Sequence, residues 1–213
     1  PTLVPGVNTE NIGGIIHFAI QNLPIVRGVH FQPVSYFGRY PTPPRDADRI
    51  TLPEVISKIE TQTGGKIALE SFQPQMTGNP LCSFHGSFVY MPDKSIAPIK
   101  DTGECKCQAT EEDAIIKARD FVANKWTIPK KSMPCCSEPG SELNDLDSYI
   151  DRLRRYGFSI SGMAFQDAWN LDLERLRRCK IHIMSPDKRV IPFCSYNLTD
   201  SQGIPLYREE YGR

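Results

Sequence analysis

Apolar and polar positions divide the start of the chain into a strand, a helix and a second strand. Residues 2–7 form an apolar run that ends in a turn. Residues 26–35 are rich in valine and phenylalanine. Between these runs, apolar residues recur at intervals of three and four, the spacing of one helix face: Ile12, Ile15, Ile16, Ala19, Ile20 and Leu23. This order predicts a β-α-β unit with parallel strands and a right-handed crossover, and Asn8 or Thr9 as the helix cap.

The rest of the chain shows alternating helix and strand signals. Residues 51–64 predict a helix, because Thr51 and Glu54 have capping-box spacing, Pro53 lies in the first turn and Gly64 follows the end. The later segments are assigned from their periodicity: short strands and turns at 66–99, helices at 111–126, 143–157 and 172–178, and a strand at 158–165. Gly157 is expected to cap the helix that precedes that strand.

Composition excludes several classes of function. The 213 residues are 39% hydrophobic, enough for a core, and 25 basic residues balance 25 acidic ones. Without a basic stripe, nucleic-acid binding is not expected. The apolar runs are too short to span a membrane and there is no signal peptide, so we expect a cytoplasmic protein. The chain does not begin with methionine and starts inside a strand-like run. We therefore expect it to be the C-terminal fragment of a longer protein.

Cysteine is the residue type that points to chemistry. The chain has seven, an odd number without a secretory signal, which argues against a disulfide framework. Metal ligation and free buried thiols remain as alternatives. Cys105 and Cys107 lie in a polar loop, where apolar packing explains a cysteine poorly, so ligation gains weight. Cys82 precedes His85 by three residues, a weak ligand pattern, and Cys135–Cys136 are expected to be thiols near solvent.

The last two cysteines flank a predicted hairpin at residues 179–194. A loop centred between Pro186 and Asp187 places three pairs opposite one another: Cys179 with Cys194, Ile181 with Pro192, and Ile183 with Val190. The two thiols would then lie about 5 Å apart at Cβ on a buried face. This geometry allows two free core thiols, and it equally allows half of an iron–sulfur or zinc site.

Several stretches resemble one family of enzymes. TLVPGVNTENIGGIIHFAIQ and VRGVHFQPVSYFGR resemble the late β-α-β portion of a radical S-adenosylmethionine (SAM) barrel. RITLPEVISKIETQTGG, PLCSFHGSF and CKIHIMSPDKRVIPFCSYNLTDSQGIPLYR resemble the C-terminal region of the branch containing the radical SAM (seleno)protein TrsS family and tetraether-synthase-like relatives. The resemblance implies an α/β fold in three parts. Residues 1–40 would end a partial (β/α) barrel, 41–50 would be a linker, and 51–213 would form a small α+β C-terminal domain.

The resemblance also implies a chemistry. In such enzymes a [4Fe-4S] cluster on a Cys-x-x-x-Cys-x-x-Cys loop cleaves SAM, and the resulting 5′-deoxyadenosyl radical abstracts hydrogen from the substrate. This chain lacks that loop, so the fragment alone is not expected to generate the radical. By the same resemblance, Asn8 would lie near SAM, and Gln32 and Ser35 would face the SAM or substrate cavity.

The C-terminal stretch further resembles the auxiliary-cluster domains of radical SAM maturases. This implies one auxiliary [4Fe-4S] site, with ligands drawn from Cys82, Cys105, Cys107, Cys179 and Cys194. The partners implied are an electron donor such as a ferredoxin or flavodoxin, and a peptide, protein or small-molecule substrate. Two alternatives remain. One is a zinc-stabilised binding module held by Cys82, Cys105, Cys107 and Cys194. The other is a plain α/β domain with free core thiols.

Overall fold

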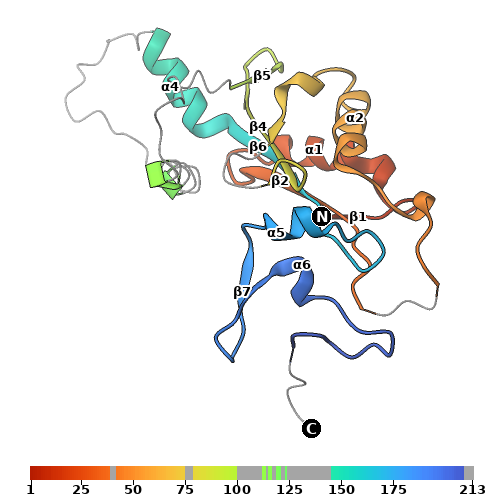
Figure 1. The fold of residues 1–213 in the computed structure, drawn as a ribbon. Helices are drawn as coiled ribbons and strands as arrows, with labels where there is room; N and C mark the ends of the chain where they lie inside the picture. The colour runs from red at the N-terminus through yellow and green to blue at the C-terminus, as the bar shows by residue number, and fades with distance from the viewer. Residues whose placement is uncertain are drawn as a thin grey trace.

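A single mixed sheet forms the centre of the molecule (Figure 1). The computed structural model describes residues 1–38, 42–74, 79–99, 112–113, 115–116, 119–120, 123 and 145–208. The sheet has the order β1 (Thr2–Leu3), β2 (Gly28–Pro33), β6 (Gly157–Met163), β4 (Ser83–Tyr90) and β3 (Gln73–Pro74), with β5 (Ile96–Pro98) also paired to β4. No helix in the described part of the chain is both long and apolar enough to cross a membrane.

Strand directions confirm the predicted α/β class. β1 pairs with β2 in parallel, as the β-α-β pattern predicts, and β2 pairs in parallel with β6. β4 runs antiparallel to β6, β3 and β5. The predicted linker at 41–50 does not interrupt this sheet, because β2 precedes the linker and β6 follows it. The division into 1–40, 41–50 and 51–213 and the partial barrel stay predictions.

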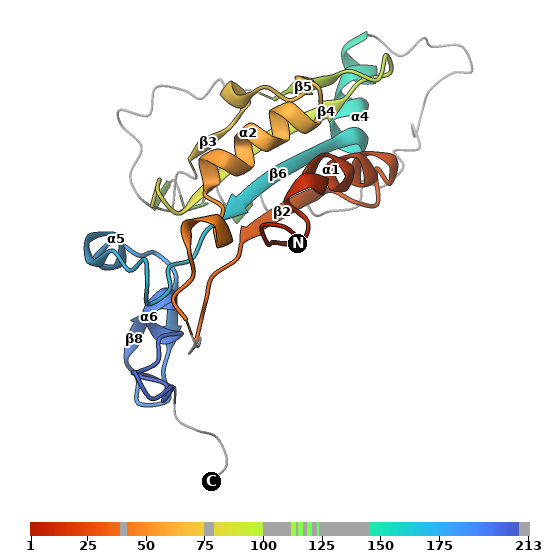
Figure 2. The same cartoon turned by 90° about the vertical axis from the view of Figure 1, so that its right-hand side faces the viewer.

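Two helices cover one face of the sheet and bury the core (Figure 2). α1 (Ile12–Gln21) and α2 (Leu52–Gln62) lie side by side and pack against each other. Their close approach requires Gly13, since a Cβ there would lie 2.6 Å from the Gln62 carbonyl oxygen. The Gln62 side chain joins the helices by accepting from the Gly13 N–H at 2.9 Å and donating to the Thr9 carbonyl at 2.8 Å.

The predicted cap of α2 is confirmed, and the predicted cap of α1 is wrong. Thr51 Oγ1 accepts from the Glu54 N–H, and the Glu54 carboxylate accepts from the Thr51 N–H at 2.7 Å. Gly64 follows the helix with a φ of +63°. Asn8 makes no side-chain capping bond, and Thr9 begins the short 3-10 helix Thr9–Asn11 that precedes α1. The N-cap of α1 is Asn11, which makes no side-chain capping bond either. The Asn8 amide is instead committed to the backbone around β1.

The helix expected at 143–157 is α4 (Asp145–Tyr156), but Gly157 does not act as its left-handed cap. Gly157 is the first residue of β6 and lies opposite Val89. A Cβ at Gly157 would lie 2.4 Å from the Leu153 carbonyl oxygen, so close approach rather than turn conformation requires glycine there. The helix expected at 111–126 falls largely outside the described residues.

The C-terminal segment lies beyond one end of the sheet, and α4 lies at the other end (Figures 1 and 2). The segment contains α5 (Leu173–Arg177), β7 (His182–Met184), β8 (Val190–Pro192) and α6 (Phe193–Tyr196). The short helix predicted at 172–178 is therefore confirmed. Asp172 caps α5, because its Oδ1 accepts from the N–H groups of Glu174 and Arg175.

The hairpin register predicted for residues 179–194 is wrong by one position. Strand β7 pairs with β8 as His182 with Pro192, Ile183 with Ile191 and Met184 with Val190. The turn is centred on Asp187 because Lys188 adopts a φ of +66° and the Ser185 N–H donates to the Arg189 carbonyl. A slip of one residue exchanges the two faces of a strand. Cys179 therefore does not lie opposite Cys194, which belongs to α6.

Candidate functional site at the carboxyl edge of the sheet

The carboxyl ends of the parallel strands meet at the edge next to the C-terminal segment. Ser35 follows β2 at this edge, and its Oγ donates to the Phe165 carbonyl, just beyond β6, at 3.0 Å. Because β4 runs the opposite way, it begins at the same edge. Cys82 immediately precedes it, and the Cys82 carbonyl accepts from the Ala164 N–H at 2.9 Å. This edge is where α/β folds usually bind ligands.

A buried carboxylate ties three segments together at this edge. Asp167 is fully buried and forms a bidentate ion pair with Arg49, both distances being 2.9 Å. Its oxygens also accept from the backbone N–H groups of Tyr36 at 2.8 Å and Trp169 at 3.1 Å. The Arg49 guanidinium lies 5.2 Å from the centre of the Tyr36 ring. Asp167 thus holds the chain after β2, the start of α2 and the chain after β6 in fixed positions.

Three of the candidate cysteines gather at this edge as free thiols. Cys82 Sγ accepts from Arg175 Nε at 2.9 Å, and the same guanidinium donates to the Ala164 carbonyl at 2.5 Å. The buried Cys194 Sγ accepts from the Gln166 N–H at 3.3 Å. Cys179 Sγ donates to the Ile181 carbonyl at 3.1 Å. The start of β4 and the C-terminal segment therefore bring these thiols to the strand ends.

The surroundings of the Cys194 thiol change its pKa. Burial raises the pKa of the Cys194 thiol, and the neighbouring Cys179 and Cys82 raise it further. The Gln166 N–H and the Arg175 guanidinium act in the opposite direction and lower that pKa. In this environment Cys194 is a neutral, inert thiol at pH 7 unless a cation or metal ion compensates for the loss of hydration.

The three cysteines have the chemistry of cluster ligands, but the described residues do not show the geometry of a metal site. Thiolates are the usual ligands of iron–sulfur clusters, and three of them belong to the predicted pool. Within the described ranges, however, no group of three or more His, Cys, Asp or Glu side chains is arranged to hold a metal ion. Cys105 and Cys107 lie outside the described residues. The ligand set therefore stays a prediction.

The residues predicted to face SAM or substrate have different surroundings. The Asn8 amide accepts from the Val4 N–H and donates to the Thr2 carbonyl, both at 2.8 Å, so both of its polar atoms already bond the chain around β1. Ser35 lies at the carboxyl edge. Gln32 is half-buried near the end of β2, and its backbone N–H donates to the Pro1 carbonyl. Contact of these residues with SAM stays a prediction.

Two residues important to this edge were not found from the sequence. Arg175 reaches Cys82 over a separation of 93 residues, and Arg49 reaches Asp167 over 118 residues. Neither pair has a local spacing signal, because each depends on strand pairing. The sequence does give a sign at Asp167, the one charged residue within 164–170, since a lone charged residue is found buried only when it is paired.

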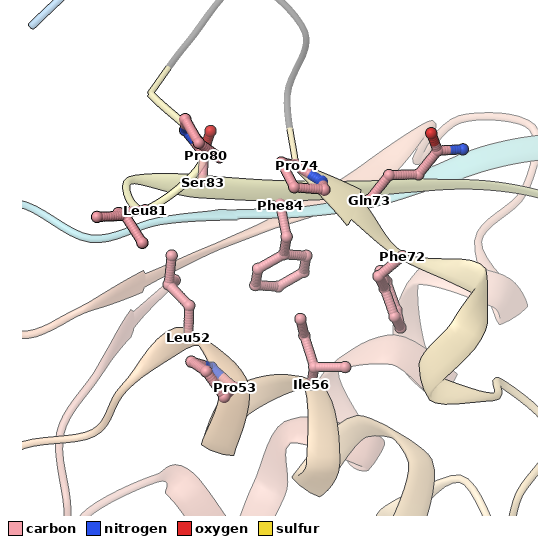
Figure 3. A pocket seen from close by; sticks show the side chains of 10 residues that line it. All are labelled: Leu52, Pro53, Ile56, Phe72, Gln73, Pro74, Pro80, Leu81, Ser83 and Phe84. Carbon is pink, nitrogen blue, oxygen red and sulfur yellow. The ribbon is translucent and has the colours of Figure 1, made fainter. Parts of the chain in front are cut away.

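A separate apolar pocket of about 220 Å³ lies between α2 and the strands β3 and β4 (Figure 3). Side chains of Leu52, Ile56, Phe72, Leu81 and Phe84 surround it. None of its ten lining residues is titratable. It can accommodate an apolar group, but its lining offers no titratable acid or base for catalysis.

Comparison with curated proteins finds a relative that aligns with most of the chain. No family model matches the chain. The chain is 33% identical to 7,8-dihydro-6-hydroxymethylpterin dimethyltransferase from Methanocaldococcus jannaschii over an alignment 244 positions long. The alignment covers 96% of this chain and 48% of that enzyme. The chain thus spans about half the length of this relative. The similarity does not single out the TrsS branch.

Proposed function

We propose that this chain forms part of a radical SAM methyltransferase that acts on a small heterocyclic substrate. The observation that carries the proposal is the 33% identity to a pterin dimethyltransferase across 96% of the chain. That relative, by its name, methylates 7,8-dihydro-6-hydroxymethylpterin. A reduced pterin is therefore the first substrate to test, in preference to a peptide or protein.

The carboxyl edge is consistent with this role. Ser35, at the end of β2, and Gln32 within β2 would line the cavity for SAM or substrate. Asp167 and Arg49 would hold that edge rigid, since their ion pair joins segments on both sides of β2. A reduced cluster bound elsewhere in the enzyme would supply the 5′-deoxyadenosyl radical from SAM, with a ferredoxin or flavodoxin as the electron donor.

An auxiliary iron–sulfur site at the same edge is part of the proposal. Cys82, Cys179 and Cys194 would contribute three thiolates, and Cys105 or Cys107 would complete the set. Cys82 and Cys179 both raise the pKa of the Cys194 thiol, and this proximity supports the proposal. Assembly of such a cluster requires reduced thiols, so a reducing cytoplasmic location belongs to the same proposal.

The test is a turnover assay under anaerobic conditions. The coding region of this chain is expressed together with the sequence that adjoins it in its gene, and the purified protein is supplied with SAM, a chemical reductant and 7,8-dihydro-6-hydroxymethylpterin. We expect 5′-deoxyadenosine and a methylated pterin, both detected by mass spectrometry and both absent without reductant. Formation of neither product from the reconstituted protein would overturn the proposal. Methylation of a peptide instead would retain the class and replace the substrate.

A further inference from the structure

The sheet has a polar face opposite the helices α1 and α2. Phe31, Ile160 and Phe84 belong to the core beneath those helices. Because successive side chains in a strand point to opposite faces, the alternate positions of β2, β6 and β4 share the other face. With the exceptions of Gly28, Gly157, Met163 and Val89, these positions carry polar side chains. We call them the polar face: His30, Gln32, Ser83, His85, Ser87, Ser159 and Ser161.

Strand register places two histidines and a serine in one row across this face. Ser161 in β6 lies opposite His30 in β2 and also opposite His85 in β4. Neighbouring strands are about 4.8 Å apart, so the two histidine backbones are separated by roughly 10 Å with the serine between them. The His30 Nδ1 and Ser161 Oγ atoms form a hydrogen bond of 2.9 Å. The row therefore presents imidazole and hydroxyl groups in a line about as wide as a bicyclic ring.

Ser83 adds an independent indication of a ligand. It belongs to the same face and is only 3% exposed, and within the described part of the chain its Oγ has no hydrogen-bond partner. Burial of a hydroxyl without a partner is unfavourable. Ser83 lies opposite Met163 at the carboxyl edge, next to Cys82. A bound polar molecule would satisfy this hydroxyl at the end of the face nearest the thiols.

The charge of the face selects the kind of ligand. None of its seven side chains is acidic, and none is a lysine or arginine. Burial lowers the pKa of His30, so its imidazole is neutral near pH 7. A neutral imidazole, hydroxyls and an amide can both donate and accept hydrogen bonds. Such a set suits an uncharged heterocycle with several donors and acceptors better than a phosphate or a carboxylate.

We propose that the row His30–Ser161–His85 binds the heterocyclic ring of the substrate by hydrogen bonds, with Ser83 bonding a polar group near the carboxyl edge. The inference rests on the proposed function for its choice of a reduced pterin. It assigns binding residues that neither the motifs nor the similarity to the pterin enzyme identifies. The pterin ring system, with amide, amine and ring-nitrogen groups, matches this mixture of donors and acceptors.

A binding titration of the purified chain tests the inference directly. Under anaerobic conditions 7,8-dihydro-6-hydroxymethylpterin is titrated into the wild-type chain and into the H30Q and S161A variants, with calorimetry as the readout. Loss of one or two hydrogen bonds of about 1 kcal/mol each predicts a 5- to 30-fold weaker Kd in the variants. The H17Q variant is the matched control, because His17 lies on α1 and bonds Gln21 at 2.8 Å. Its Kd is expected to stay within twofold of wild type.

Circular dichroism of each variant shows whether the fold is retained, and proton NMR of the wild-type histidine rings gives a second readout. Pterin should shift the ring signals of His30 and His85 and leave those of His17 and His182 unchanged. No binding by the wild-type chain, or an unchanged Kd in both H30Q and S161A, would overturn the inference. This outcome can be separated from failure of the proposed function, since binding needs neither SAM nor a cluster. Methyl transfer with an unaltered KM in H30Q would retain the function and reject the site.

Discussion

The ion pair between Arg49 and Asp167 gives a sharp prediction of stability. Asp167 is fully buried, and Arg49 retains only 19% side-chain exposure. Replacing Arg49 with methionine keeps most of the side-chain length and removes both charged hydrogen bonds to the carboxylate. The buried Asp167 would then keep only the backbone N–H groups of Tyr36 and Trp169 as partners.

The expected loss follows from leaving a buried charge unpaired. Removing one partner of a buried ion pair typically costs 3–5 kcal/mol, and because two backbone donors remain for Asp167 we expect about 3 kcal/mol for R49M. Small domains are stable by about 5–15 kcal/mol, so this loss is a large fraction of the total. The R49M/D167N double variant should recover part of the loss, because its buried side chain carries no charge.

Urea unfolding followed by circular dichroism measures these effects on the purified chain. A double-mutant cycle over wild type, R49M, D167N and R49M/D167N should give a coupling energy of about 2 kcal/mol, within the range for contacting residues. The control is R177A, because Arg177 pairs with Glu174 while both side chains remain 74% and 69% exposed. A surface pair of this kind contributes about 0.5 kcal/mol or less. If R49M loses no more stability than R177A, the argument from burial is wrong.

Three further predictions concern packing, capping and protonation. G162A should destabilise the chain by about 1–3 kcal/mol in urea unfolding, because a Cβ there would lie 2.4 Å from Phe84 Cε1; stability equal to wild type would contradict this. T51A should cost about 1 kcal/mol through loss of the capping box, with a smaller loss in E54Q, and an unchanged unfolding midpoint for both would reject it. By NMR, His30 should titrate below 6.5, since burial lowers its pKa. The His30 imidazole therefore binds protons more readily in the unfolded chain, so its protonation favours unfolding as pH falls below 6.5. A measured His30 pKa of 6.5 or above would refute this prediction.

Local signals predicted those elements whose ends depend on nearby residues. The helix α2 follows from Thr51, Glu54 and Gly64, all of which act within one turn of its ends. The parallel pair β1–β2 follows from the β-α-β order. The hairpin register could not be predicted in this way, because it depends on the left-handed conformation of Lys188, a residue type that seldom adopts it.

Contacts between distant residues were the part that the sequence could not predict. The cysteines were chosen as candidates by residue type, and three of them do approach one edge of the sheet. Their approach depends on β4 pairing antiparallel with β6 and on Arg175 bonding Cys82. The Asn8 cap failed for a related reason, since its amide bonds the backbone around β1 rather than the helix that follows.

Strand register was needed to find the polar face, in addition to the alternation of polar and apolar residues along each strand. Alternation identifies His30, His85 and Ser161 as members of strand faces, but it does not say which strands are neighbours. The pairing of β6 with both β2 and β4 brings the three residues into one row.

Anaerobic reconstitution of the purified chain with iron and sulfide is the measurement that tests the central claim most directly. The account predicts about four iron and four sulfide per chain, with broad absorbance near 400 nm. It also predicts loss of both in the C82A and C194A variants. The C135A/C136A double variant is the control and should retain the cluster. One tightly held zinc without sulfide would instead favour the zinc-stabilised module, and trace iron alone, with chelators leaving the Tm unchanged, would contradict a metal site of either kind.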